Sequence, residues 1–279
     1  MPVRVALAQF DCHLGEVDAN LDHMRQLTAQ ATAQQADLVI FPELAVHGYW
    51  LGQLPEGRSL GVHDPRLGRL ADGGTDVLAG FHEDSGVRTY NSAAYLSGGG
   101  LVHLHRKLYL PNYKHWEERK HYSPGQSLRA FDTRHGRAAV LICNDAWQPA
   151  LPWLAAQDGA ELLLVPANSA AEMTPASLDT IGYWQQLLLF IARMQQCWVV
   201  FVNRVGTEAG ARFWGGSRVV APDGEVIAEA PMWDPALMTV DIDFGASRRQ
   251  RRELPLLAEA RLGLVQRELG RLIAEGGDA

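Results

Sequence analysis

Short apolar runs recur along the whole chain, and they constrain the fold more than any other feature. Residues 3–10 and 38–41 are two such runs, and each has the length and apolar content of a buried strand. Between them, apolar residues repeat at helical spacing after Asp18, the expected N-cap, as far as Ala31. The chain is therefore predicted to begin with a strand, a helix and a second strand.

Further runs of the same kind predict a larger set of strands. They lie at 76–81, 90–96, 101–105, 138–143, 162–165, 198–202, 218–220, 226–228 and 238–242. Helices are predicted at 181–194 and 256–273, and another after Pro149. About ten to twelve strands favour two sheets over one, because open sheets rarely exceed about ten strands. We expect an α/β fold.

The domain organisation predicted is simple. No linker, low-complexity segment or internal repeat interrupts the chain, which favours one domain over residues 1–279. We expect a C-terminal arm from about residue 245 that packs on other elements or takes part in oligomerisation. The basic run 248–252 is expected to be a solvated helix face or an anchoring corner.

Composition excludes several classes of function. A formal net charge of -7 and a pI near 5.8 disfavour nucleic-acid binding, which requires a positive field. Three scattered cysteines, Cys12, Cys143 and Cys197, form neither a disulfide framework nor a metal site. No apolar run reaches the roughly 20 residues that a membrane helix needs, and no signal peptide is recognised. We expect a cytoplasmic protein.

Three residues at predicted strand ends could carry chemistry. Cys143 ends an apolar strand, although on position alone a buried structural thiol is the simpler interpretation. A nucleophilic thiol needs a base, because little of it is thiolate at neutral pH. None of the ten histidines lies in a cysteine-protease signature around Cys143. Glu43 and Lys107, which follow two other strands, are the alternative partners.

Together these residues stand in three motifs that resemble the signature blocks of the nitrilase, or carbon-nitrogen hydrolase, superfamily. The blocks are 41–44 (FPEL), 106–111 (RKLYLP) and 141–145 (LICND). Residues 159–166 and 215–224 are also similar to later strands of that superfamily, so the resemblance covers nearly the whole chain. It implies a four-layer α-β-β-α sandwich that forms homodimers or larger homo-oligomers.

The resemblance also implies roles for single residues. Glu43 would be the general base, and Lys107 would stabilise the oxyanion together with the backbone N–H of Asn144. Cys143 would be the nucleophile. Glu118, and less well Glu117, matches a second glutamate that would orient Lys107. No metal or organic cofactor is implied, and a nearby ammonium is expected to favour the thiolate.

The motifs leave the substrate open. Nitrilases usually carry Trp-Glu after the cysteine, whereas this chain has Asn144 and Asp145, which favours amides over nitriles. The segment 142–145 is similar to N-carbamoyl-amino-acid amidohydrolases. Residues 107–113 resemble the glutaminase domain of glutamine-dependent NAD synthetases. No synthetase domain follows, so a free-standing amidase is preferred.

The preferred function is thiol-dependent hydrolysis of a non-peptide carbon–nitrogen bond in a small linear amide or N-carbamoyl substrate, through a thioester on Cys143. Ammonia or an amine would leave. A stand-alone glutaminase and a catalytically silent binding module are the alternatives. Candidate substrate-binding residues are Tyr49, Trp147, Asn168 and Trp184. A thiol protease is excluded by the missing histidine motif.

Overall fold

Two six-stranded sheets form the centre of the structure, a computed structural model that describes residues 2–50, 58–171 and 179–277. The first sheet has the order β16 (Ala236–Ile242), β1 (Val3–Gln9), β2 (Leu38–Ile40), β3 (Asp76–Asp84), β4 (Thr89–Ser97) and β5 (Gly100–Arg106). The second has the order β15 (Val226–Glu229), β14 (Arg218–Val220), β11 (Trp198–Asn203), β10 (Leu162–Ala167), β9 (Arg137–Val140) and β8 (Phe131–Asp132). Two hairpins stand apart, β6 (Asn112–Tyr113) with β7 (Trp116–Glu117) and β12 (Val205–Glu208) with β13 (Ala211–Trp214).

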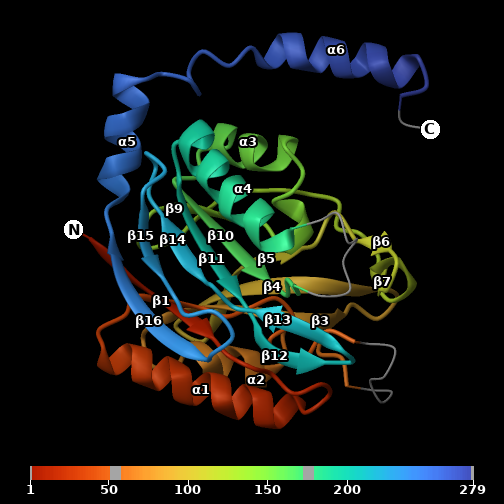
Figure 1. Cartoon of the computed structure of the whole chain (residues 1–279), viewed down its shortest axis with the longest axis vertical. Helices are drawn as coiled ribbons and strands as arrows, with labels where there is room; N and C mark the ends of the chain where they lie inside the picture. The colour runs from red at the N-terminus through yellow and green to blue at the C-terminus, as the bar shows by residue number, and fades with distance from the viewer. Residues whose placement is uncertain (1, 51–57, 172–178, 278–279) are drawn as a thin grey trace.

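Helices cover the outer faces of both sheets (Figure 1). On the first sheet lie α1 (Val17–Ala33) and α2 (Pro65–Gly68), and on the second lie α3 (Ala150–Gln157) and α4 (Thr180–Gln195). After β16 come α5 (Phe244–Glu253) and α6 (Leu262–Ala274), and single 3-10 turns occur at η2 (Arg69–Ala71), η3 (Glu118–Lys120) and η4 (Cys143–Asp145). The predicted α/β fold with two sheets between helix layers is confirmed.

Side-chain alternation along the strands creates the layers. In β1, Val5 and Leu7 point into the core between the two sheets, where they join Val200 of β11. Ala6 and Ala8 point the other way and pack in the core beneath α1. Because neighbouring strand residues face opposite sides, a nearly unbroken apolar run serves two cores at once.

Two details near the chain ends correct the sequence predictions. The first helix begins at Val17 with Glu16 at the N-cap, and Asp18 instead accepts a hydrogen bond from Arg66 at 2.9 Å. The predicted helix at 256–273 begins too early, since residues 256–259 form a turn and α6 covers only Leu262–Ala274. No residue of α6 is buried, so it does not pack on the described residues of its own chain.

The basic run lies on α5 and forms an anchoring corner. Arg248 donates to both carboxylate oxygens of Glu161, at 2.6 and 2.9 Å, and Arg251 donates to the carbonyl oxygen of Ala160 at 2.6 Å. These bonds fix the start of the C-terminal arm to the second sheet.

Strand direction places the carboxyl ends of several strands at the same edge of each sheet. In the first sheet, β2 and β3 are parallel, and β5 is two antiparallel steps from β3, so it points the same way. In the second sheet, β9, β10 and β11 are parallel. Segments that leave the carboxyl ends of parallel strands are where α/β folds place reactive groups.

Candidate active site

Glu43, which follows β2, is the centre of a buried hydrogen-bond network. Its Oε1 accepts from Lys107 Nζ at 2.6 Å and from Asn91 Nδ2 at 2.7 Å. Its Oε2 accepts from the backbone N–H of Asn168 at 2.8 Å. Since Asn168 follows β10 of the second sheet, this one carboxylate joins the strand ends of both sheets.

Lys107 is held by a second carboxylate as well. Its Nζ donates to Glu118 Oε1 at 2.7 Å, and the same oxygen accepts from the hydroxyl of Tyr49 at 2.6 Å. Glu117, the competing candidate, is exposed and pairs with Lys120. The structure therefore brings Glu118, and not Glu117, to Lys107.

The charge on Lys107 is secured by these neighbours. Burial alone lowers the pKa of Lys107, but Glu118 and Glu43 outweigh it, so the pKa lies above its usual value. The ammonium is 1% exposed and has a carboxylate on two sides. A cation held in this way, away from water, suits the stabilisation of negative charge that develops on a substrate oxygen.

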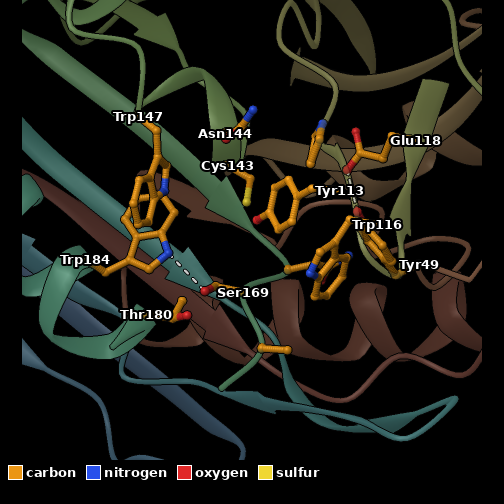
Figure 2. A pocket seen from close by; sticks show the side chains of 13 residues that line it. Tyr49, Tyr113, Trp116, Glu118, Cys143, Asn144, Trp147, Ser169, Thr180 and Trp184 are labelled. Carbon is orange, nitrogen blue, oxygen red and sulfur yellow. Dashed lines mark hydrogen bonds between the residues drawn. The ribbon is translucent and has the colours of Figure 1, made fainter. Parts of the chain in front are cut away.

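Cys143 stands on a sharp turn after β9. Its φ is +46°, in the left-handed region that residues other than glycine adopt rarely. The one-turn helix η4 begins on Cys143, and none of the hydrogen bonds among the described residues uses the N–H of Asn144. The turn thus presents a thiol and an available backbone donor to the pocket (Figure 2).

The expected effect of the Lys107 ammonium, which lowers the pKa of Cys143, is present, but other groups outweigh it. Burial raises the pKa of Cys143 well above its usual value, and Glu43 and Glu118 raise it further, against the opposing effect of Lys107. The thiol is therefore protonated at neutral pH. Attack on a substrate requires an acceptor for that proton.

A limiting dose of iodoacetamide is expected to alkylate Cys143 before the other two cysteines. Cys143 lines an open pocket, whereas Cys12 and Cys197 are 1% and 0% exposed. The rate should rise with pH, because the raised pKa keeps the thiolate scarce near neutrality. Peptide mass spectrometry over time measures the order, and earlier modification of Cys12 or Cys197 would contradict it.

Asp145 has a structural role at the site that was not predicted from the sequence. Its carboxylate is fully buried and accepts from the backbone N–H groups of Leu108 and Tyr109, both at 2.9 Å. It also accepts from the N–H of Ile142 at 3.1 Å and lies 2.9 Å from His105 Nε2. Asp145 therefore ties the segment after Lys107 to the turn that carries Cys143.

A cavity of about 330 Å³ opens onto this turn (Figure 2). The predicted residues that line it are Tyr49, Glu118, Cys143, Asn144, Trp147, Asn168 and Trp184. Glu43 and Lys107 lie behind the wall instead, in contact with Glu118 and Asn168. The structure thus gathers all nine predicted residues in one region, while their roles stay predictions.

Several lining residues were not predicted from the sequence. Tyr113 and Trp116 come from the β6–β7 hairpin, and Ser169 and Thr180 flank Trp184. Ser169 Oγ accepts from the indole N–H groups of Trp184, at 2.9 Å, and of Trp214, at 3.0 Å. Serine after a strand is common, so only the fold reveals that this hydroxyl holds two tryptophans in place.

Titration of Glu118 is expected to make stability depend on pH. Burial, with the charge of Glu43, raises the pKa of Glu118 from 4.5 to about 7, against Lys107 and Tyr49. The folded state then binds this proton more tightly than the unfolded state, so the contribution to the free energy of unfolding falls as pH rises from 4.5 to about 7.

Urea unfolding of the wild type and of Glu118→Gln over this pH range measures the effect. The glutamine variant cannot titrate, so the wild type should lose stability relative to it as pH rises. Parallel curves for the two proteins would show that Glu118 does not titrate in this window.

Two classes of feature are absent from the described part of the chain. No group of three or more His, Cys, Asp or Glu side chains there is arranged to bind a metal ion. Nor does any helix in residues 2–50, 58–171 and 179–277 combine the length and apolarity needed to cross a membrane.

The two-sheet sandwich between helix layers is a nitrilase-type fold, and Glu43 and Lys107 lie near the Cys143 turn within it. The family model described as carbon-nitrogen hydrolase matches residues 4–252, and the chain belongs to that family. The recognition of the superfamily from its motifs is therefore confirmed.

The relatives of this chain have different activities, so they do not single out one substrate for it. The chain is 29% identical to a glutamine-dependent NAD(+) synthetase of Acinetobacter baylyi, matching 89% of this chain but 46% of that protein. It thus spans less than half the length of that relative. It is 27% identical to N-carbamoylputrescine amidase of Arabidopsis thaliana, with 89% of each chain matched.

Solved structures agree with the fold. A mutant of the Nesterenkonia AN1 amidase from the nitrilase superfamily superposes with a TM-score of 0.80 at 25% identity, covering 95% of this chain and 96% of that one. A carbon-nitrogen hydrolase from Helicobacter pylori G27 has a TM-score of 0.87 at 23% identity, with 96% and 99% covered, and supports the fold.

Proposed function

We propose that this protein hydrolyses the carbon–nitrogen bond of a small linear amide or N-carbamoyl substrate through a thioester on Cys143. The observation that carries the proposal is the Glu43 carboxylate, bonded at once to Lys107 Nζ and to the N–H of Asn168 beside the cavity that Cys143 lines. The proposed base and cation thus lie directly behind the wall of the pocket that the thiol lines.

In the first half-reaction, the thiol proton of Cys143 passes to Glu43 as Sγ attacks the carbonyl carbon. The resulting oxyanion is stabilised by the Lys107 ammonium and the N–H of Asn144, and each such donor contributes about 2.7–4 kcal/mol in related sites. The tetrahedral intermediate collapses, and the leaving nitrogen takes the proton from Glu43. Ammonia or an amine departs, and the acyl group remains on Cys143.

In the second half-reaction, Glu43 removes a proton from water, whose oxygen attacks the thioester. The thiolate leaves, regains its proton from Glu43, and a carboxylic or carbamic acid is released. Glu118 holds Lys107 in position throughout by its 2.7 Å hydrogen bond. The steps as written use no metal or organic cofactor.

A substrate panel tests the proposal. Ammonia release is measured for simple amides, ureido acids, glutamine and nitriles, with Cys143→Ala as the matched control. The proposal expects cysteine-dependent release from at least one amide or N-carbamoyl compound. Release equal to that of the control across the panel would favour a catalytically silent module.

A stand-alone glutaminase is the second candidate. It is favoured by the similarity to the NAD(+) synthetase of Acinetobacter baylyi, although that protein is more than twice as long as the matched region. Glutamine is therefore part of the panel, and it is compared with amides of equal length.

We also propose that residues 1–279 form one domain that pairs with a second copy through its C-terminal arm. Phe190 of α4 is 56% exposed, and Leu269 and Ile273 of α6 are 53% and 59% exposed. Two apolar helix faces on one chain can cover each other in a two-fold dimer. A small-molecule substrate and a second copy are thus the proposed partners.

Replacing both Leu269 and Ile273 with glutamate is expected to convert the dimer into a monomer, because charge would enter the proposed apolar interface. Light scattering after gel filtration measures the mass. Arg267→Glu, on the same helix, is the control for charge and should stay dimeric. A monomeric wild type would contradict the pairing.

A further inference from the structure

Two aromatic walls enclose the space in front of Cys143 (Figure 2). On one side, Trp147 and Trp184 pack edge to face with ring centroids 5.5 Å apart. On the other, Tyr49 and Trp116 pack edge to face at 5.1 Å. A substrate carried to the thiol therefore places its acyl group between aromatic surfaces, which gain from burying apolar area.

No cationic side chain lines the pocket among the described residues. Lys107, which lies behind the wall, already donates to Glu43 at 2.6 Å and to Glu118 at 2.7 Å. Two carboxyl groups already surround this one ammonium, so Lys107 is not available as a counter-ion for a charged substrate group. An anionic group entering this space would find no counter-ion.

The polar groups that face the pocket from β10 onward are uncharged. Neither side-chain atom of Asn168, Oδ1 or Nδ2, has a hydrogen-bond partner in the described structure, although the residue is only 3% exposed. Ser169 Oγ is occupied as an acceptor by two indole N–H groups. The amide of Asn168 and the hydroxyl of Ser169 can therefore bind neutral polar atoms of a substrate, but they cannot balance a full charge.

Other sources of positive charge are few. Residues 51–57 and 172–178, which the structure does not describe, contain no lysine, arginine or histidine. Lys114 and His115 stand at the turn of the β6–β7 hairpin, between the lining residues Tyr113 and Trp116, and both are exposed. Lys114 is the first cation to examine when anionic substrates are tested.

Resting on the proposed function, we propose that the pocket takes amides whose acyl group is uncharged and apolar, aromatic or aliphatic, and rejects those that carry a carboxylate. A carboxylate buried between the aromatic walls without a counter-ion loses its hydration uncompensated. On this inference glutamine and N-carbamoyl amino acids are poor substrates.

Matched substrate pairs test the charge selectivity in the protein of residues 1–279. Ammonia release is followed for pentanamide against 4-carbamoylbutanoate, and for phenylacetamide against its para-carboxylate. The ratio of kcat/KM should favour the neutral member by about 100-fold or more, since the site leaves the charge unpaired. Equal or higher kcat/KM for the anionic members would overturn the inference while leaving the proposed function intact. Release from no amide or carbamoyl compound would overturn both.

A cation added to the wall provides a second, independent test. Thr180 lines the pocket, is 8% exposed, and its Oγ1 has no hydrogen-bond partner in the described structure. Thr180→Lys should raise the ratio of anionic to neutral kcat/KM by about 10-fold over Thr180→Met, which has similar length without charge. Equal ratios in two folded variants would refute the electrostatic explanation.

A third test of the inference replaces Lys114 with methionine. The inference expects the ratio of anionic to neutral kcat/KM to stay as in the wild type. A selective loss of activity on the anionic members would show that Lys114 supplies a counter-ion, and would overturn the proposal.

Discussion

Replacing Cys143 with alanine is expected to lower ammonia release by about 10⁴-fold or more, because no thioester can form without the thiol. The neighbouring hydroxyl of Ser169 offers no substitute, since its Oγ accepts two indole N–H groups and has no carboxylate among its described partners. Initial rates on the best substrate of the panel measure the effect.

Cys12→Ala is the matched control for this variant. Cys12 is 1% exposed in the core beneath α1, so its loss perturbs packing without touching the pocket. Thermal unfolding of both variants separates folding defects from catalytic ones. Wild-type activity in a folded Cys143→Ala protein would remove Cys143 from the mechanism.

Glu43→Gln is expected to lower kcat by about 10²–10⁴-fold, the usual contribution of a general base. The amide keeps the shape of the carboxylate but cannot take the thiol proton, and the raised pKa of Cys143 makes that transfer necessary. Lys107 should stay in place, because Glu118 still accepts its hydrogen bond.

Glu161→Gln is the control for the loss of a buried carboxylate. Glu161 is 7% exposed and pairs with Arg248 far along the chain on α5, and it does not line the pocket. Its glutamine variant should lose stability and keep kcat. If Glu43→Gln kept the wild-type kcat while folded, another base would be required.

Local patterns predicted much of this molecule. Apolar runs located eleven of the sixteen strands in the described residues to within a few residues, but missed β6, β7, β8, β12 and β13. Motifs singled out Glu43, Lys107 and Cys143, which the fold brings together. Strand signals are local, and the motifs stand directly at strand ends. The sequence alone therefore identifies these three residues.

Features that depend on distant segments meeting were not predictable. Asp145 bonds Leu108 and Tyr109, and Ser169 meets Trp214, only because separate strands are packed together. The net direction of the pKa shift of Cys143 was not predictable either, because it depends on burial and on Glu43, which together outweigh the expected effect of Lys107. The helical pattern correctly predicted a helix at α6, but the pattern does not show which surface this helix contacts.

The bond between Glu43 and the N–H of Asn168 makes the site a product of two consecutive halves of the chain. Glu43, Lys107 and Glu118 precede the irregular stretch at 121–130, whereas Cys143 and Asn168 follow it. Neither half of the chain contains all five of these residues. Two fragments divided in that stretch would each be silent, so turnover would report their reassembly, as in a split-enzyme sensor.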